Sequence, residues 1–219
     1  MDTKHWLLLP LLLALGVALG YAVVSMPEPG QELPTMLANN MEVSGVSNPV
    51  TAVLLNFRGY DTLLEMGVLL GALLGVWSLG GIVENRESSP GQVLDIMSRQ
   101  LVPVLILVAG YLLWAGADAP GGAFQAGSLL AAAGVLLLLC GWRLDNRYSG
   151  LPLRVLLVLG LGMFVIAGIG LLLLQGGFLL YPPAAAGGLI LIIEAAATLS
   201  IGTTLAAMFL GGRPMGAEL

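Results

Sequence analysis

Long apolar runs separated by short polar segments dominate the pattern along the chain. A helix needs about 20 mostly apolar residues to cross the hydrocarbon core of a bilayer, and six runs reach or approach that length. We therefore expect about six transmembrane helices, over Trp6–Val24, Thr62–Val83, Gln100–Gly116, Gly121–Gly141, Pro152–Leu174 and Ala184–Leu210. The pattern predicts an all-α integral membrane protein.

A polar segment near residue 90, ENRESSPGQ, has the composition of a linker and divides the chain. We expect a two-span unit over residues 1–89 and a four-span unit of tight hairpins over residues 90–219. The first run follows Lys4 like a secretory signal, but its apolar core is longer than that of a signal peptide, which favours a retained anchor. Within the long segment that follows it, Pro49–Phe57 is apolar but too short to span. It is expected to lie in the membrane interface or to dip into protein as a re-entrant piece.

Positive charges predict the orientation of the spans. Six spans place Arg58 alone on one side and every other Lys and Arg on the other. The second set comprises Lys4, Arg86, Arg99, Arg143, Arg147, Arg154 and Arg213. Because cytoplasmic loops are enriched in Lys and Arg, both termini are predicted to be cytoplasmic, with the protein in the cell (inner) membrane.

Composition excludes several classes of function. Charged residues make up 10% of the chain and hydrophobic residues 58%, against roughly 25% charged in soluble domains. The chain has no basic patch, which argues against nucleic acid as a partner. A single His and a single Cys provide too few ligands for a soft-metal site or an iron–sulfur cluster and no catalytic triad, so we expect neither cofactor, metal nor enzymatic activity.

Glu194 is the sharpest chemical signal, because it lies about ten residues into the last apolar run. A carboxylate at such depth costs several kcal/mol unless it is paired, protonated or hydrated. Thr198 and Gly202 follow at helical spacing and form a polar and small-residue stripe suited to close helix packing. Two interpretations remain open: a role in or beside an ion path, and a protonated carboxyl that bonds neighbouring helices.

A second polar group, FRGYDTLLE, lies at the start of the second long apolar run and contains Arg58, Gly59 and Asp61. Arg58 and Asp61 are predicted to form an ion pair in a turn fixed by Gly59. Thr62 and Glu65 have the spacing of a capping box, which satisfies free N–H groups at a helix start. The alternative is that Glu65 pairs with Arg58 or meets a partner subunit.

A third group breaks the chain before the fourth span, because Pro and paired Gly interrupt helices. Backbone N–H groups at the resulting helix start can bind an anion or order water. The alternative is a purely structural role, as a tight hairpin between closely packed helices. The segment contains Asp118, Pro120, Gly121, Gly122, Phe124, Gln125 and Gly127.

Two of these segments carry a resemblance. The segment NPVTAVLLNFRGYDTLLEMGVLLGALLGVWSL resembles the C-terminal part of the large A subunit of Mrp-type multisubunit Na+/H+ antiporters, whose pattern is D-F-R-G-[FY]-D-T-x-G-E before a span. Arg58, Gly59, Asp61, Thr62 and Glu65 match, whereas Asn56 and Leu64 depart from the pattern.

The segment LVPVLILVAGYLLWAGADAPGGAFQAGSLLAAAGVLL is similar to the B subunit of the same antiporters, whose hallmark is [HDN]-x-P-G-G-G-F-x-[GA]-G. Ala123 replaces the third Gly, and Glu194 corresponds to an acidic residue in the last span of B subunits. The order of the two segments follows the usual gene order.

The resemblance implies a membrane subunit of a cation/proton antiporter that contributes to or supports a path for protons and Na+. Its expected partners are other membrane subunits of the same complex. The resemblance places Glu194, Glu65, Asp61, Arg58 and Asp118 among the ion-path candidates. The rival hypothesis is a non-conducting scaffold subunit of an energy-coupled complex, such as a relative of the membrane-bound hydrogenases.

Overall fold

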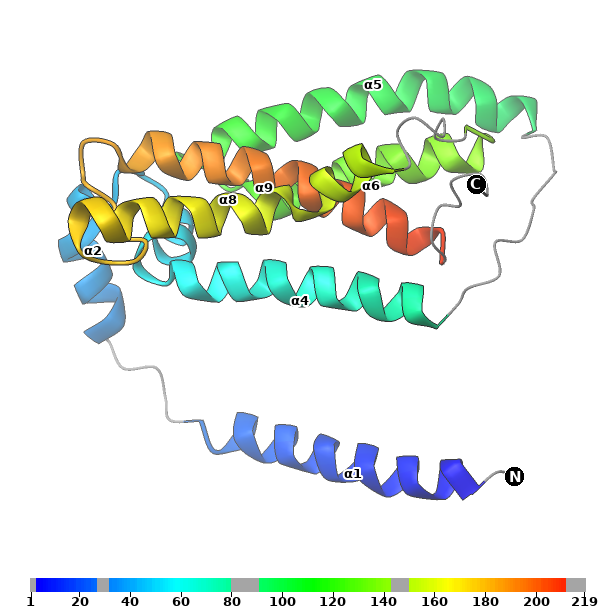
Figure 1. Cartoon of the computed structure of the whole chain (residues 1–219), viewed down its shortest axis with the longest axis horizontal. Coiled ribbons are helices and arrows are strands. Elements are labelled where there is room, and N and C mark those ends of the chain that lie inside the picture. Colours follow the sequence, from blue (N-terminus) through cyan, green and yellow to red (C-terminus); the bar gives the residue numbers. More distant parts are fainter. Residues whose placement is uncertain (1–2, 27–31, 80–90, 143–149, 212–219) are drawn as a thin grey trace. The chain divides into compact units, whose positions relative to one another are not determined.

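A computed structural model of the protein describes residues 3–26, 32–79, 91–142 and 150–211 (Figure 1). These residues form helices and connecting turns without a β-strand, as the apolar pattern predicts. The chain divides into two compact units, Met1–Met36 and Leu37–Leu219. The helices are α1 (Thr3–Val24), α2 (Glu32–Ser44), α3 (Pro49–Thr51), a π-helix (Ala52–Phe57), α4 (Gly59–Ser78), α5 (Gln92–Ala115), α6 (Ala123–Leu139), α8 (Leu151–Gln175) and α9 (Ala186–Phe209).

The first unit consists mainly of α1, an apolar helix with Pro10 inside it. All its side chains from Pro10 to Val24 are exposed within the unit. An apolar helix that buries nothing against its own unit needs lipid or another protein around it.

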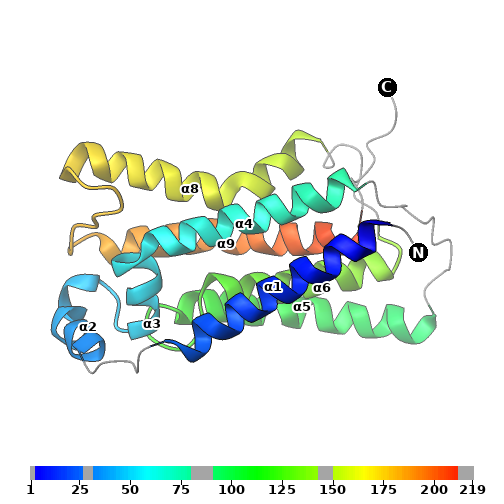
Figure 2. The same ribbon diagram turned by 90° about the horizontal axis from the view of Figure 1, so that it is seen from below.

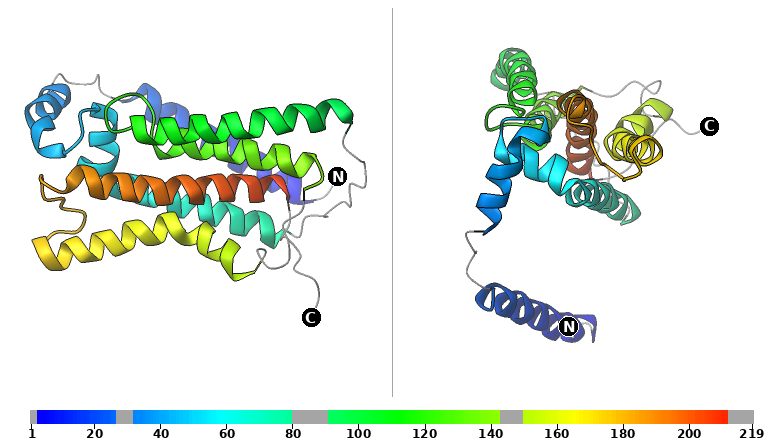
Figure 3. Two further views of the ribbon diagram at one scale, coloured as in Figure 1. Left: turned by 90° about the horizontal axis from the view of Figure 1, so that it is seen from above. Right: turned by 90° about the vertical axis from the view of Figure 1, so that its left-hand side faces the viewer.

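The second unit is a bundle in which consecutive long helices run antiparallel (Figure 2). Helices α4, α6 and α9 run in one direction, and α5 and α8 run in the other (Figures 1 and 3). The turns 116–122 and 176–185 and the short helix α3 therefore gather at one end of the bundle (Figure 3). This end contains the start of α6 and the start of α9.

Helices α4, α5, α8 and α9 are long and apolar enough to cross a membrane. The apolar part of α1 over residues 10–24 and helix α6 are shorter. The helical character of the chain is thus confirmed, and the described residues contain four helices that are candidate membrane spans and two shorter apolar helices.

Two helical segments differ from the pattern-based prediction because they are polar. Helix α5 begins at Gln92, eight residues before the predicted start at Gln100, and Arg99 Nε lies 3.0 Å from Asp95 Oδ2 within this extension. Helix α2 was not predicted. One face of it buries Ser44 and packs Leu37 and Met41 against the core, whereas Leu33, Met36 and Val43 are exposed.

Helix α9 lies at the centre of the second unit, and half of its 24 residues are buried. It packs against α6 on one side and α8 on another. On the α8 side the Ser200 hydroxyl donates to the Leu157 carbonyl at 2.6 Å, a hydrogen bond of the kind that joins membrane helices. Phe164 of α8 and Met66 of α4 complete the core beside Ile193.

The apolar segment Pro49–Phe57 folds into α3 and the π-helix. Ala52 and Leu55 are buried in the main core cluster, whereas Val50, Leu54 and Phe57 are exposed. The segment therefore enters the protein on one side, in agreement with a re-entrant piece. Asn48 caps it, since its Oδ1 accepts hydrogen bonds from the Val50 and Thr51 N–H groups at 2.8 and 3.4 Å.

Candidate functional site: a buried glutamate at a broken helix

Glu194 is the ninth residue of α9, which places it about 12 Å along the helix at 1.5 Å per residue. Only 3% of its surface is exposed. Its neighbours in the buried interior include the apolar side chains Ile190, Ile193 and Ala197 of the same helix. A charged carboxylate in such surroundings is costly without a partner.

The partner comes from the turn between α5 and α6. The Ala123 N–H, at the first residue of α6, donates a hydrogen bond to Glu194 Oε1 at 3.3 Å. The two residues are 71 positions apart in sequence. Because the free N–H groups and the dipole of a helix start favour negative charge, the start of α6 stabilises the carboxylate form of Glu194.

Gly122 makes this contact sterically feasible. Its φ of +105° is one that side chains with a Cβ rarely adopt, and a Cβ built there lies 2.7 Å from Glu194 Oε1. Gln125 Oε1 lies 3.9 Å from the same point. The turn itself is held to the end of α5, where the Gly122 N–H donates to the Leu112 carbonyl at 2.9 Å.

The second carboxylate oxygen of Glu194 has no hydrogen-bond partner. Oε2 is fully buried, and no donor reaches it from the residues that the structure describes. The Thr198 hydroxyl, which lies one turn further along α9, donates instead to the main-chain carbonyl of Glu194 at 2.8 Å. A buried carboxylate oxygen without a hydrogen bond costs free energy. Oε2 is therefore the atom of this site that can accept a ligand which binds and leaves during transport.

Small residues bring α6 and α9 into close contact beside the carboxylate. A Cβ on Gly127 would lie 2.7 Å from Ile201 Cγ2, and one on Gly202 would lie 2.9 Å from Leu130 Cβ. The predicted small-residue stripe that contains Gly202 therefore packs against α6 at Gly127. This close approach fixes the start of α6 opposite Glu194.

A second set of contacts holds the α5–α6 turn from the side of the re-entrant segment. The Ser47 and Asn48 N–H groups donate to the Ala117 carbonyl at 3.0 and 2.9 Å. The Thr51 hydroxyl donates to the Gly116 carbonyl at 2.5 Å. These contacts tie the first antiporter-like segment, which begins at Asn48, to the turn that positions Glu194.

Asp118, a predicted ion-path residue, lies on this turn but not at the Glu194 carboxylate. It is exposed and accepts a hydrogen bond from the Ser47 hydroxyl at 2.6 Å. It lines an open cleft of about 660 Å³ together with Glu42 of α2 and Leu191 of α9. Pro120 and Phe124 of the same motif are also exposed.

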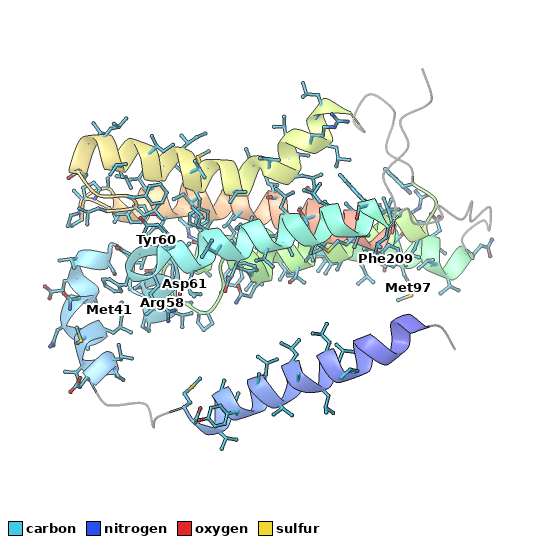
Figure 4. All side chains as sticks on the ribbon, turned by 60° about the horizontal axis from the view of Figure 1, so that its bottom comes forward. Met41, Arg58, Tyr60, Asp61, Met97 and Phe209 are labelled. Atoms are coloured by element: carbon cyan, nitrogen blue, oxygen red, sulfur yellow. The ribbon has the colours of Figure 1, made fainter. Side chains whose placement is uncertain are left out.

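The polar group at the start of α4 is separate from this site. Arg58 and Asp61 form the predicted ion pair, and Figure 4 shows them side by side. The ring of Tyr60, which lies between them in sequence, packs at a tilt on the ring of Phe178 of the α8–α9 turn, with ring centroids 5.2 Å apart. Both charged side chains are largely exposed, so the pair is a weak source of stability.

The capping-box interpretation of Thr62 and Glu65 is wrong. Helix α4 begins at Gly59, three residues before Thr62, and the Thr62 hydroxyl donates to the Leu54 carbonyl of the π-helix at 2.6 Å. Glu65 is exposed on α4 and forms no ion pair with Arg58. The second alternative, in which Glu65 meets a partner, is the one that this placement favours.

Sequence reasoning did not single out Ser47, Asn48 and Thr51. Their side chains are ordinary polar groups in a loop, and only the Asn-Pro pair at residues 48 and 49 is a recognisable helix-start signal. Tyr181 was also missed. It lies on the α8–α9 turn with its hydroxyl buried and unpartnered among the described residues, and this burial raises the pKa of Tyr181 above its usual range.

Comparison with protein families identifies the second half of the chain. Residues 93–211 match the model of a domain related to the MnhB subunit of Na+/H+ antiporters. This match covers more than half of the chain and includes the α5–α6 turn and Glu194. The chain belongs to this MnhB-related family.

Two curated relatives extend the similarity. A protein of Rhizobium meliloti (strain 1021), named as the probable A/B subunit of a K+/H+ antiporter, is 28% identical over 196 residues, which are 73% of this chain and 19% of that protein. The B subunit of a Na+/H+ antiporter of Bacillus subtilis (strain 168) is 29% identical over 97 residues, which are 43% of this chain and 67% of that protein. The MnhB-related chain thus spans about a fifth of the first relative and two thirds of the second.

Two solved structures share the fold. A chain of the membrane-bound sulfane sulfur reductase, an archaeal respiratory membrane complex, has a TM-score of 0.72 and 27% identity, with 96% of this chain and 98% of that chain covered. A chain of the Mrp complex from Dietzia sp. DQ12-45-1b has a TM-score of 0.69 and 25% identity, with 100% of this chain and 27% of that chain covered.

Proposed function

We propose that this MnhB-related chain is a membrane subunit of a multisubunit cation/proton antiporter and that Glu194 lies on its ion path. The observation that supports this most strongly is the buried carboxylate at the start of α6, with one oxygen bonded to Ala123 and the other without a partner among the described residues. Intramembrane carboxylates with this degree of burial commonly mark proton paths. The names of the curated relatives support the exchange of a monovalent cation for protons.

The experiment that tests this function is cation-dependent proton exchange in vesicles that contain the assembled complex with Glu194→Gln. A conducting role predicts a complex that assembles and does not transport. A scaffold role predicts that substitutions in this chain prevent assembly instead.

The second candidate is a subunit of a respiratory membrane complex. One observation favours it: this chain covers 98% of a chain of the sulfane sulfur reductase complex, whereas it covers 27% of the matching Mrp chain. In a respiratory complex Glu194 would have the same role on an ion path, and transport would be coupled to the redox subunits of that complex. The genes beside this one separate the candidates, since antiporter subunits are expected for the first and redox subunits for the second.

We propose six spans, with residues 1–89 forming the two-span unit and residues 90–219 forming the four-span unit that contains the MnhB-related domain. Of the charged residues that orient the spans, Arg86, Arg143, Arg147 and Arg213 lie outside the described residues. The antiparallel order of α4, α5, α6, α8 and α9 agrees with this topology (Figure 2).

Reporter fusions test the orientation. A reporter at Gly150, before α8, is expected to lie in the cytoplasm, and a reporter at Gly176, after α8, is expected to lie outside the membrane. The seven-to-one distribution of Lys and Arg is the physical reason. The reverse pattern of reporter activity would contradict cytoplasmic termini.

We propose that α4 meets partner subunits through a row of glycines and, on a different side, through Glu65. Glu65 is exposed on a helix long enough to span a membrane, and lipid does not solvate a carboxylate there. Gly67, Gly71 and Gly75 lie at spacings of four on the same helix, and a Cβ built on any of them contacts nothing. Residues two apart on a helix do not face the same way, so Glu65 lies on a different side of α4 from this row and needs a separate hydrogen-bond donor. The spacing of four allows a helix of a partner subunit to approach closely along the glycine face.

A bulky substitution at Gly71 tests this face. Gly71→Leu is expected to release the partner subunits while leaving the chain folded, because the added side chain contacts nothing within the chain. Gly110→Leu on α5 is the matched control, since a Cβ at that position also contacts nothing. The measurement is the size of the purified complex in mild detergent. A complex of parental size with Gly71→Leu would exclude a partner on this face.

A further inference from the structure

We infer that the ligand of the Glu194 carboxylate is a proton and not a metal cation, so that Na+ or K+ crosses the complex at a different place. The inference rests on the proposed function, because it assumes that Glu194 takes part in transport. It concerns the substrate of the site, which the names of the relatives leave open. Three properties of the site carry it: the number of oxygen atoms, the electrostatics and the space.

The site offers few side-chain oxygen atoms for a hard cation. Such cations bind in shells of about six oxygen ligands, and K+ needs a ring of carbonyls that replaces its hydration shell. Around Glu194 the buried side chains Ala123, Ile193 and Ala197 are apolar. No cluster of three His, Cys, Asp or Glu side chains occurs in the parts of the chain that the structure describes. Gln125 adds one neutral oxygen near the carboxylate.

The electrostatics of the site are also unfavourable for a metal ion. Glu194 Oε1 already accepts the Ala123 N–H, and the start of α6 adds the positive end of a helix dipole. This positive potential opposes a proton and a metal ion alike, but a metal ion would have only the one remaining carboxylate oxygen, Oε2, to bind it. A proton on Oε2 forms a covalent O–H bond, needs no further ligands, and leaves Oε1 free to keep its bond to Ala123.

The third property is the enclosure of the Glu194 carboxylate. Glu194 is 3% exposed and does not line the cleft that contains Asp118 and Glu42. The last residue of α9 that lines this cleft is Leu191, about one turn before Glu194. A hydrated cation fits the cleft, whereas the carboxylate beyond it is enclosed by packed side chains. A proton needs no opening of that size, because it is transferred between hydrogen-bonded oxygen atoms instead of moving as a hydrated ion.

Infrared difference spectroscopy of the complex in lipid vesicles tests the inference. A protonated carboxyl has a C=O stretching band distinct from that of the carboxylate. We expect an acid-minus-base band that disappears in Glu194→Gln and remains in Glu65→Gln. Its midpoint pH should be unchanged when choline is replaced by Na+ or K+ at constant ionic strength.

Competition by a cation would overturn the inference. A cation that binds the same carboxylate lowers the midpoint by about one pH unit for each tenfold rise in concentration above its dissociation constant. Absence of any band assigned to Glu194 would also overturn it, since the carboxyl would then hold no proton. Failure of the proposed function is distinguishable from both: it is parental transport by Glu194→Gln, whatever the infrared result.

Discussion

Replacement of Glu194 by Gln is expected to leave the complex assembled and to reduce cation-dependent proton exchange to the level of vesicles without the complex. Gln has nearly the same size as Glu, and its side-chain oxygen retains an acceptor for the Ala123 N–H. The substitution removes only the group that takes up and releases a proton. The measurement is the dissipation of a pH gradient across vesicles after addition of Na+ or K+.

Two outcomes would contradict this expectation in different ways. A Gln variant that assembles and transports like the parent would show that Glu194 only bonds neighbouring helices. A variant that fails to assemble would favour the scaffold hypothesis. Glu65→Gln serves as the control for loss of a membrane carboxylate elsewhere, and its transport defect is expected to be milder, because Glu65 is exposed on α4 and distant in the chain from the α6 start.

The apolar pattern predicted most of the long helices because lipid imposes a strong constraint on length and polarity. It failed where helices are polar on one side. Helix α2 contains Asn39, Asn40 and Glu42, and only packing of Leu37 and Met41 against the second unit makes it part of the core. The early start of α5 was missed for the same reason, since Asp95 and Arg99 interrupt its apolar run.

The chemistry of the site was predicted in parts but not as a whole. Glu194 and the break at Gly121 and Gly122 were each recognised as unusual, one for its charge and the other for its free N–H groups. Nothing in the spacing of residues 71 positions apart indicates that they touch. Their contact depends on the packing of α6 against α9, which is a property of the folded bundle.

The capping-box error has a similar origin. Thr62 and Glu65 have the correct spacing for a capping box at a helix start. However, α4 begins earlier, at Gly59, because the π-helix ends at Phe57 and Arg58 leads directly into α4. The Thr62 hydroxyl then finds the Leu54 carbonyl instead of a free N–H group. A carbonyl exposed by the wider turn of a π-helix competes successfully for a nearby hydroxyl.

Gly122→Ala is expected to impair transport as strongly as the loss of the Glu194 proton site. The added Cβ would lie 2.7 Å from Glu194 Oε1, so either the carboxylate or the start of α6 must move. The φ of +105° adds backbone strain, of order 1–3 kcal/mol for a residue with a side chain. Transport in vesicles and the thermal stability of the complex measure the two effects separately.

Gly141→Ala separates strain from the contact with Glu194. Gly141 also has a positive φ, +81°, but a Cβ built there contacts nothing. Both variants are therefore expected to lose stability through backbone strain, whereas only Gly122→Ala should lose transport and shift the infrared band of Glu194. Equal transport by the two variants would show that the contact between Glu194 and the start of α6 is dispensable. In that case the partner that the carboxylate needs in the membrane would have to come from another protein of the complex, and the proton site would lie at an interface instead of within this chain.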